Sequence, residues 1–412
     1  MFGAGMKPAK SRMIPSSKSG RRVYDIRYTE QLVSEMFIDL HTQRIKSLSN
    51  AVTGVLHAAQ LTVHCIGQAY AAVAEMSPKH GVKQIDRLLS NTGLDLDYLM
   101  GGWIRYAVGN HETLTIALDW TIFDDDDHAT LAAYMITNHG RAMPLAWRTV
   151  KQSELKEKQT GHEDALIQFL HEHLPGTTRV TLLADRGFGR QSLYSLLATL
   201  GWDYVIRFRE GILVEDVHGT QRLASEWLHP KGIARKLAGA RVTDERTEIG
   251  AVVVLKAARM KESWCLATSM RNAPAAAIAK LYGRRFTIEE TFRDTKDLRF
   301  GLGLRATHIK RSDRRDRLLL LIAVAHTLLC LLGAAAEEAG LDRHLKANTV
   351  KRRTHSLYRQ GAYWYGCIAT MREEWFRPLV RTLDRIVREN AFLASFFGLP
   401  HDPAAYDQPA QK

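Results

Sequence analysis

The sequence predicts an α/β fold in which a mixed sheet core is flanked by helical regions on both sides. Three observations predict it. Apolar residues recur at helical spacing from Tyr28 to Leu99. From His111 the pattern changes to short β-rich runs separated by helical segments. From Leu318 to about Phe397 the spacing is helical again. The sheet therefore occupies the middle of the chain.

Composition limits the class of protein. The chain has 412 residues, and its 45% hydrophobic content supports about two to four domains with buried cores, which excludes a disordered protein. A formal net charge of +13 indicates an acidic polymer as partner, with nucleic acid as the first candidate. The four cysteines form no CxxC pair and no zinc-ligand spacing. We therefore expect an intracellular protein, cytoplasmic and associated with the nucleoid.

The first part of the chain offers two basic segments. Residues 1–22 are rich in Lys, Arg, Ser, Gly and Pro and lack the apolar run of a secretory signal, so we expect a disordered basic arm. Leu61 to Leu89 is typical of a helix, a turn and a second helix that begins at Ser77 and Pro78. The second helix carries Lys79, His80, Lys83 and Arg87 on or near one side. This suits a recognition helix in the major groove, but equally any basic amphipathic helix.

Two aspartates follow strand-like runs in the middle of the chain. TLTIALDW predicts a strand that ends at Asp119, and HATLAAYMITN and RAMPLAWRTV predict two more. After a helix from Glu163 to Leu174, TRVTLLADRGFG predicts a buried strand that ends at Asp185 and turns on Gly187 and Gly189. Side chains at the carboxyl ends of strands converge at a sheet edge, so the two aspartates are expected to lie close together.

The stretch YGRRFTIEETFRDTK, residues 282–296, places four different polar groups in one line. Tyr282, Arg285, Glu289 and Lys296 lie at offsets of 0, 3, 7 and 14, within roughly 60° of arc on a continuous helix. One interpretation is a surface helix with a single Arg285–Glu289 pair. The other is a phosphodiester site, because a carboxylate can hold a metal while cations and a hydroxyl bind phosphate oxygens.

Glu289 would supply a third carboxylate beside Asp119 and Asp185. Oxygen ligands without His or Cys are what Mg²⁺ prefers, and two Mg²⁺ about 3.5 to 4 Å apart can hold both the attacking and the leaving oxygen of an in-line displacement at phosphorus. The acidic run Asp124 to Asp127 is a competing metal site, although consecutive loop carboxylates are usually a solvated turn.

These motifs resemble one known family. The spacing Y-(2)-R-(3)-E-(6)-K, together with the aspartates in LDW and LADRGFG, is similar to that of bacterial insertion-sequence transposases of the DDE type, and more narrowly to the insertion sequence 4 family. The words IEETFRD, GLGLR, IDRLLSN and ANTVKRR most resemble the transposase of the composite transposon that carries tetracycline resistance. The resemblance extends from about His41 to Arg353.

The resemblance implies a ribonuclease-H-like core interrupted by a β-rich insertion. Between Asp185 and Glu289 lie 103 residues (186 to 288), which leaves room for one. The expected parts are a basic arm (1–22), a helical DNA-binding domain (23–110), the core (111–210 and 269–336), the insertion (211–268) and a helical C-terminal region (337–412). In relatives a tryptophan of the last insertion strand stacks on a flipped base, and Trp264 has the matching place. A core Trp of a small sheet is the alternative.

The resemblance also assigns roles. Asp119, Asp185 and Glu289 would hold two Mg²⁺, with Mn²⁺ as a substitute. Tyr282, Arg285 and Lys296 would contact phosphates of the transposon ends. The implied partners are the inverted repeats of the chain's own element and target DNA, bound by a homodimer on paired ends, without a membrane. One site would cut the end, form a hairpin, reopen it and join the 3′-OH to target DNA.

Two other functions remain open from the residues themselves. A metal-dependent nuclease or resolvase of the same core would share the three carboxylates, and a catalytically silent DNA-binding relative would keep the basic helices.

Two segments near the end of the resemblance each allow two structural interpretations. The basic stretch from Arg299 to Arg317 would either line the DNA path or form a solvated loop. The uncharged run from Leu318 to Ala336 is long enough for a membrane span, but a core helix is favoured.

Overall fold

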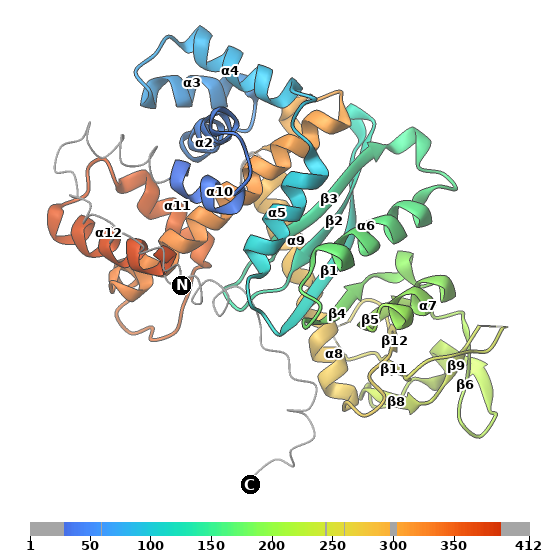
Figure 1. Cartoon of the computed structure of the whole chain (residues 1–412). Helices are drawn as coiled ribbons and strands as arrows, with labels where there is room; N and C mark the ends of the chain where they lie inside the picture. The colour runs from blue at the N-terminus through green and yellow to red at the C-terminus, as the bar shows by residue number, and fades with distance from the viewer. Residues whose placement is uncertain (1–28, 59, 244, 259, 297–302, 389–412) are drawn as a thin grey trace, which may run out of the picture.

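The computed structural model describes residues 29–58, 60–243, 245–258, 260–296 and 303–388. The predicted basic arm, residues 1–22, lies outside this range. Helices from the two ends of the described chain gather on one side of a large sheet, and a smaller sheet lies on the opposite side of the molecule (Figure 1). The α/β architecture with a mixed sheet agrees with the predicted fold class, whereas the predicted domain boundaries stay predictions.

The α-helices, after a first helix over residues 29–36, are α2 (Thr42–His57), α3 (Val63–Val73), α4 (Pro78–Ser90), α5 (Leu96–Val108), α6 (Gln159–His173), α7 (Gln191–Thr199), α8 (Ala275–Gly283), α9 (Thr287–Lys296), α10 (Ser312–Glu338), α11 (Leu357–Cys367) and α12 (Glu373–Arg388). The strands are β1 (Thr113–Phe123), β2 (His128–Met135), β3 (Met143–Lys151), β4 (Arg179–Ala184), β5 (Asp203–Phe208), β6 (Leu213–Glu215), β7 (Gln221–Leu223), β8 (Arg235–Ala238), β9 (Arg241–Val242), β10 (Thr247–Glu248), β11 (Ala251–Leu255) and β12 (Trp264–Thr268).

The large sheet is mixed. Its order is β3-β2-β1-β4-β5-β12-β11-β8, with β1, β4 and β5 parallel and the outer pairs antiparallel. The segment 211–268, predicted to be β-rich, divides between the two sheets. Strands β8, β11 and β12 extend the large sheet beyond β5, while β6, β7, β9 and β10 form the small one. The segment is thus partly continuous with the core.

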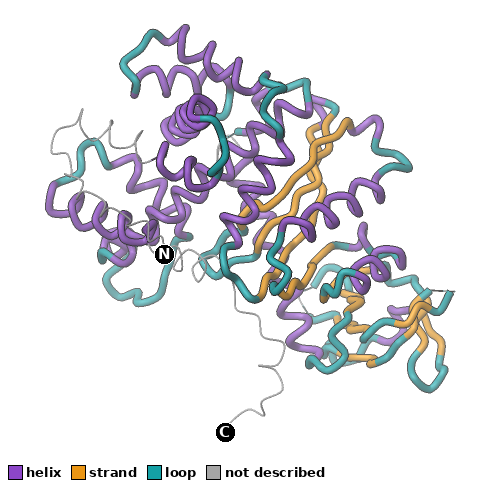
Figure 2. Tube along the Cα trace, viewed as in Figure 1, coloured by secondary structure: helices purple, strands orange, loops and turns teal. Residues whose placement is uncertain are grey.

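Helices cover both faces of the sheet at β1, β2 and β3. Figure 2 shows these layers, with helices in purple and strands in orange. On one face, Trp103 of α5 donates from Nε1 to the Pro144 carbonyl, and Trp120 of β1 donates to Glu163 of α6. On the other face, Trp147 of β3 donates to the Asp316 carbonyl of α10. Successive residues of a strand point to opposite faces, so Asp119, one residue before Trp120, points toward α9 and α10.

The helical part of the chain's first hundred residues forms as predicted. Ser77 caps α4 by accepting a hydrogen bond from the His80 amide, and Pro78 is its first residue. Helices α3 and α4 cross closely, because a Cβ on Gly67 would lie 2.3 Å from the Val82 Cα. The predicted helix–turn–helix over Leu61 to Leu89 is therefore present.

Helix α10 is the core helix that the uncharged run predicted. By length and composition it could cross a membrane, but 94% of its most apolar window is buried inside the protein. It crosses α11 at glycines, since a Cβ on Gly361 would lie 1.7 Å from the Leu329 carbonyl oxygen. Such burial against α11, α12 and β3 is typical of a core helix.

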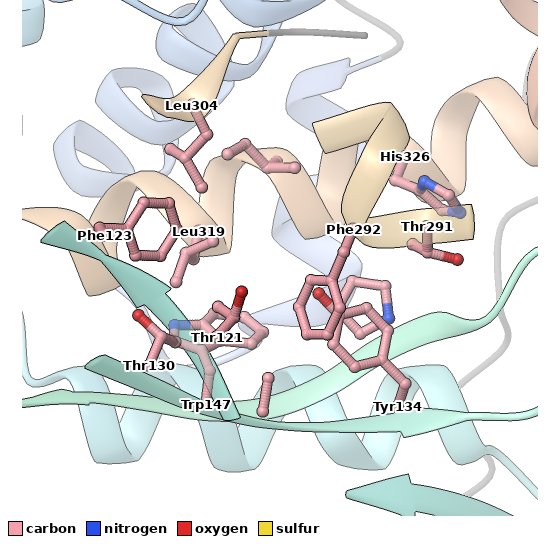
Figure 3. Close-up of a pocket in the computed structure, with 13 residues that line it drawn as sticks. Thr121, Phe123, Thr130, Tyr134, Trp147, Thr291, Phe292, Leu304, Leu319 and His326 are labelled. Carbon is pink, nitrogen blue, oxygen red and sulfur yellow. The ribbon is translucent and has the colours of Figure 1, made fainter. Parts of the chain in front are cut away.

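A small cavity lies between the sheet and helices α9 and α10 (Figure 3). Thr121, Phe123 and Tyr134 face it from the strands, and Phe292 and His326 face it from the helices. Its volume of about 20 Å³ has room for about one water molecule. A nucleotide cannot enter a space of that size, and none of the three candidate carboxylates lines it.

Protonation of His326 is expected to destabilise the fold in acid. The ring is buried and stacks on Tyr358 with centroids 4.7 Å apart, and burial lowers its pKa from 6.5 to about 4. Between these values the unfolded chain binds the proton more readily, so the stability contributed by neutral His326 is lost as pH falls from 6.5 toward 4. His326→Phe keeps a stacked ring without the titration. Its unfolding free energy in urea should therefore decline less over this range than that of the wild type.

A matched control is His80→Phe, which alters an exposed histidine of α4. It should follow the wild-type pH dependence. Equal slopes for wild type and His326→Phe would contradict the assignment.

Candidate active site

The register of two parallel strands places Asp119 beside Asp185. Strands β1 and β4 pair in parallel up to Leu118 opposite Ala184, so the next residue on each strand is an aspartate. Neighbouring strands lie about 4.8 Å apart. The prediction that the first strand ends at Asp119 was wrong, because β1 continues to Phe123 as the partner of β2. Only its pairing with β4 ends there, which opens the sheet at the two aspartates.

The turn after Asp185 is shaped by glycines, as predicted. The Asp185 carboxylate accepts a hydrogen bond from the Gly187 amide at 2.8 Å, which fixes its orientation. A Cβ on Gly187 would lie 3.1 Å from the same oxygen. A Cβ on Gly189 would lie 3.0 Å from the Arg207 carbonyl oxygen of β5. The turn therefore lies tightly against the next strand.

Residues 282–296 do not form one continuous helix, so the prediction that their four polar groups lie along one helical arc was wrong. Tyr282 lies in α8, Arg285 lies in a 3₁₀ turn over Arg284–Phe286, and Glu289 lies in α9. A 3₁₀ turn has about three residues per turn, so the angular positions on its two sides do not follow one 3.6-residue spiral. Lys296 ends α9, and its side chain lies outside the described part of the structure.

Arg285 forms hydrogen bonds with two of the three carboxylates, those of Asp119 and Glu289. Its guanidinium donates from Nη1 to Asp119 Oδ2 at 3.2 Å and from Nη2 to Glu289 Oε1 at 3.2 Å. The Arg285 side chain is only 8% exposed, whereas that of Glu289 is 55% exposed. Burial lowers the pKa of Arg285, and the charges around it raise it; Asp185 is among them, so all three carboxylates act on one cation. Residues separated by up to 170 positions thus converge.

The electrostatics show an excess of negative charge at this point. Burial raises the pKa of Asp119 from 3.8 to about 6. The Arg285 charge opposes the increase, whereas the charges of Asp185 and Glu289 add to it. Like charges held together favour protonation, or a cation that neutralises them. Arg285 is the cation present.

The donor set fits a hard divalent metal, since three carboxylates and no sulfur or imidazole are the ligands that Mg²⁺ and Mn²⁺ prefer. Among the described residues, however, no group of three or more acidic, His or Cys side chains has the geometry to hold a metal ion. The Arg285 guanidinium contacts both Asp119 and Glu289, so it competes with an ion for the same carboxylate oxygens.

Arg285→Gln is therefore expected to raise the affinity of the DNA-free chain for Mn²⁺ by about tenfold or more, the effect of about 1.4 kcal/mol. The amide removes the competing charge and still fills part of the space. Mn²⁺ titration followed by electron paramagnetic resonance measures it. Arg284→Gln, on the same turn but in no ion pair among the described residues, is the control. Unchanged or weaker Mn²⁺ binding by Arg285→Gln would show that the guanidinium does not exclude the ion.

An aromatic cluster borders the site. Trp264, the first residue of β12, packs edge-on against Tyr282 at 4.9 Å and is stacked with Phe286 at 5.9 Å between centroids. Tyr282 is 1% exposed, and burial raises the pKa of its hydroxyl. Phe286 is 40% exposed. Trp264 is thus half-buried among rings, an arrangement compatible with either alternative for it.

The sequence analysis used Glu163 only as the start of a helix and missed its contacts beside the site. This residue of α6 is 1% exposed, and its carboxylate accepts hydrogen bonds from Trp120 Nε1 at 2.9 Å and from Arg190 Nη2 at 3.2 Å. It connects the residue after Asp119 to the chain that follows Asp185. The signal was available, because Glu163 precedes Leu166, Ile167 and Leu170 at offsets of 3, 4 and 7 and so lies on the buried face of the helix.

The competing acidic run is engaged in structural contacts. Asp126 is buried and pairs with Arg315 of α10, and Asp127 accepts hydrogen bonds from the Ser153 amide and hydroxyl. Asp124 accepts one from Gln152. These carboxylates point to different partners, so the alternative metal site at Asp124 to Asp127 is not supported.

Part of the basic stretch from Arg299 to Arg317, predicted either to line the DNA path or to form a solvated loop, is engaged in ion pairs within the protein. Residues 299–302 lie outside the described range. Arg314 pairs with Asp86 of α4, Arg315 with Asp126, and Arg317 with Asp313. Arg305 and Lys310 are exposed. Arg314 and Arg315 therefore hold α10 to its neighbours, and Arg317 pairs within the helix.

Comparison with protein families agrees with this geometry. Residues 148–328 match the family model described as the transposase DDE domain. The match begins in β3, ends in α10, and includes Asp185 and Glu289 but not Asp119. A search of curated proteins found no match to the chain. Transposases of the DDE type generally use divalent metals and act on DNA. This match to residues 148–328 supports a DDE-type transposase function for the chain.

Proposed function

We propose that the chain is a cut-and-paste DNA transposase of an insertion sequence, of the insertion sequence 4 type and similar to the transposase of the tetracycline-resistance transposon. The observation that carries the proposal is the convergence of Asp119, Asp185 and Glu289 around Arg285. Its substrates are the inverted repeats of its own element and target DNA. The strongly basic composition supports such a partner.

The chain's own residues bind and orient the scissile phosphodiester. Arg285 is a planar donor that can exchange its carboxylate partners for phosphate oxygens, and Lys296 and Tyr282 are proposed as further phosphate contacts. The short Asp185–Gly187 hydrogen bond and the Glu163 network keep the turn and β1 fixed beneath the DNA. The Asp119 side chain is 20% exposed, so this flank of the site is only partly open to solvent.

Asp119, Asp185 and Glu289 are the residues that would hold divalent metal, proposed as two Mg²⁺ with Mn²⁺ as a substitute. Such ions polarise the phosphoryl oxygens and stabilise the charge of the attacking and leaving oxygens. In the first reaction a water oxygen attacks phosphorus and the 3′-oxygen leaves as a free hydroxyl. Hairpin formation, hairpin opening and strand transfer repeat the same in-line displacement with different oxygens, so one site serves all four.

The working form is proposed to be a homodimer on paired transposon ends, in the cytoplasm and associated with the nucleoid. The exposed position of Glu289 supports a substrate that approaches from solvent. A metal-dependent nuclease would use the same carboxylates, but it would not form hairpins or join a 3′-OH to a second DNA.

The test uses DNA that carries the gene with its natural flanks. Purified full-length chain and Mg²⁺ should release a fragment bounded by short inverted repeats, pass through hairpin ends, and join the fragment to a target plasmid. EDTA should stop all three. Cutting without hairpins or joining would favour the nuclease, and no cutting at the repeats would contradict the proposal.

Trp264→Ala tests the hairpin step separately. If the indole stacks on a flipped base, the variant should nick at a normal rate but accumulate hairpins about tenfold or more below wild type, because base stacking contributes about 1–3 kcal/mol. Denaturing gels of end-labelled DNA measure both products. Phe286→Ala, which removes the neighbouring exposed ring, is the control. A normal hairpin yield from Trp264→Ala would assign the indole to packing alone.

A further inference from the structure

A polar groove lies between α2 and α4, in a part of the fold remote from the sheet that carries the carboxylates. Its volume is about 210 Å³. The floor is apolar and is formed by the side chains of Ile85, Leu88 and Leu94. The rim is polar and comes from both helices and the turn after α4: Arg44, Ser47, Asn50, Gln84, Arg87 and Asn91. Figure 1 shows the two helices at the outer end of the molecule.

The groove carries uncompensated positive charge. Arg44 and Arg87 are exposed, and within the described residues neither forms an ion pair. The nearest acidic residue along α4, Asp86, is held by Arg314 of α10, whose Nη2 donates to its carboxylate at 2.8 Å. Since this carboxylate is engaged elsewhere, the two guanidinium groups at the rim are available to an anion from outside.

The turn after α4 leaves the space beside Arg44 open. The Gly93 amide donates to Asn91 Oδ1 at 3.0 Å, which folds the turn back on the end of the helix. A Cβ on Gly93 would lie 3.6 Å from Arg44 Nη2, in contact with the guanidinium. A side chain at position 93 would therefore lie against the guanidinium, whereas glycine adds no atoms there.

The groove is held at a fixed place relative to the catalytic sheet. Arg317 of α10 donates to the Leu89 carbonyl of α4 at 3.1 Å. The preceding residue of α10, Asp316, binds β3. Its carboxylate accepts a hydrogen bond from the Thr149 amide at 3.1 Å, and its backbone carbonyl accepts one from Trp147 Nε1. A ligand bound in the groove is thus held, through α10, at a fixed position relative to the sheet that carries Asp119.

We propose that this groove binds a phosphodiester unit of DNA outside the catalytic centre, an inference that rests on the proposed function. Two guanidinium groups, with amide and hydroxyl donors beside them, suit phosphate oxygens, and the apolar floor suits a deoxyribose. The backbone of duplex DNA and that of an unpaired strand share this chemistry. The groove fixes where the DNA lies on the protein, and the DNA is cut at the site of the three carboxylates.

The experiment measures binding of fluorescein-labelled mixed-sequence DNA, duplex and single-stranded, to the full-length chain by anisotropy in EDTA, so that no cutting occurs. The groove variant is Arg44→Gln with Arg87→Gln. The control is Lys46→Gln with Lys158→Gln, which removes the same charge from exposed positions on α2 and just before α6, outside the groove. Circular dichroism and thermal unfolding establish that both are folded.

The groove variant should bind at least about tenfold more weakly than the control, with a salt dependence reduced by about two phosphate contacts. Loss for duplex alone identifies a duplex backbone as the ligand, and loss for the single strand alone identifies an unpaired strand. Affinities of the groove variant within about twofold of the control for both DNAs would contradict the proposal that the groove binds DNA. If the chain then still cuts its own ends, the proposed function stands. Groove-dependent binding without any cutting would reject the function alone, and no DNA binding by wild type would reject both.

Discussion

Glu289→Gln will abolish Mg²⁺-dependent cleavage of the element's ends while leaving DNA binding intact. We expect a loss of at least about 1,000-fold in cleavage rate, since removal of one charged metal ligand takes away several kcal/mol of transition-state stabilisation. The amide is isosteric and can still accept from Arg285, so the local structure persists. Cleavage is measured on end-labelled flanking DNA, and binding by anisotropy.

The matched control is Glu290→Gln. Glu290 is the adjacent residue of α9, and it pairs with Arg293 and Arg141 rather than with the site. This variant should cut at a rate near that of wild type. A Glu289→Gln protein that retains cutting, or a Glu290→Gln protein that loses it, would move the site to a different set of residues.

Arg315→Met will destabilise the folded chain by about 3–5 kcal/mol, because it leaves a buried carboxylate without its partner. Arg315 is 0% exposed; it pairs with Asp126 and donates from Nε to His128 Nδ1 at 3.0 Å. Its guanidinium also lies 4.0 Å from the ring centroid of Phe123. Burial lowers the Arg315 pKa, and the charge of Asp126 opposes that shift. Urea unfolding measures the loss.

The double variant Arg315→Met with Asp126→Leu separates the pair from the packing. Replacing both charges with apolar groups removes the unpaired carboxylate, so the double variant should recover much of the stability that the single variant loses. A double variant as unstable as the sum of the two single ones would show that the packing of the guanidinium, and not its charge, stabilises the junction between α10 and the β1–β2 hairpin.

The sequence predicted the α/β class and the relation of Asp119 to Asp185 because both depend on local patterns. A β-rich run followed by an aspartate, twice, is enough when the strands are parallel neighbours. The end of β1 was predicted wrongly because strand termination depends on a partner. Asp119 leaves β4 but stays paired with Ala132 of β2, a tertiary contact that no local pattern contains.

The arrangement around Arg285 was the least predictable part of the site. Spacing alone favoured an i,i+4 pair with Glu289, which is present. The second contact, to Asp119, bridges 166 residues and exists only because a 3₁₀ turn between α8 and α9 redirects the side chain. The basic stretch shows the same limit, since Arg314, Arg315 and Arg317 carry charge that the fold uses internally.

The most direct measurement is Fe²⁺-mediated cleavage of the protein itself, bound to DNA that carries the ends of its own element. With added hydrogen peroxide and ascorbate, Fe²⁺ bound in place of Mg²⁺ reduces the peroxide to hydroxide and a hydroxyl radical, which cuts the backbone beside the ion. Three groups of fragments are expected, ending near Asp119, Asp185 and Glu289, and excess Mg²⁺ should suppress all three together. Cuts at only one of these segments, or a pattern unchanged in Asp119→Asn with Glu289→Gln, would contradict a single metal centre built from the three carboxylates.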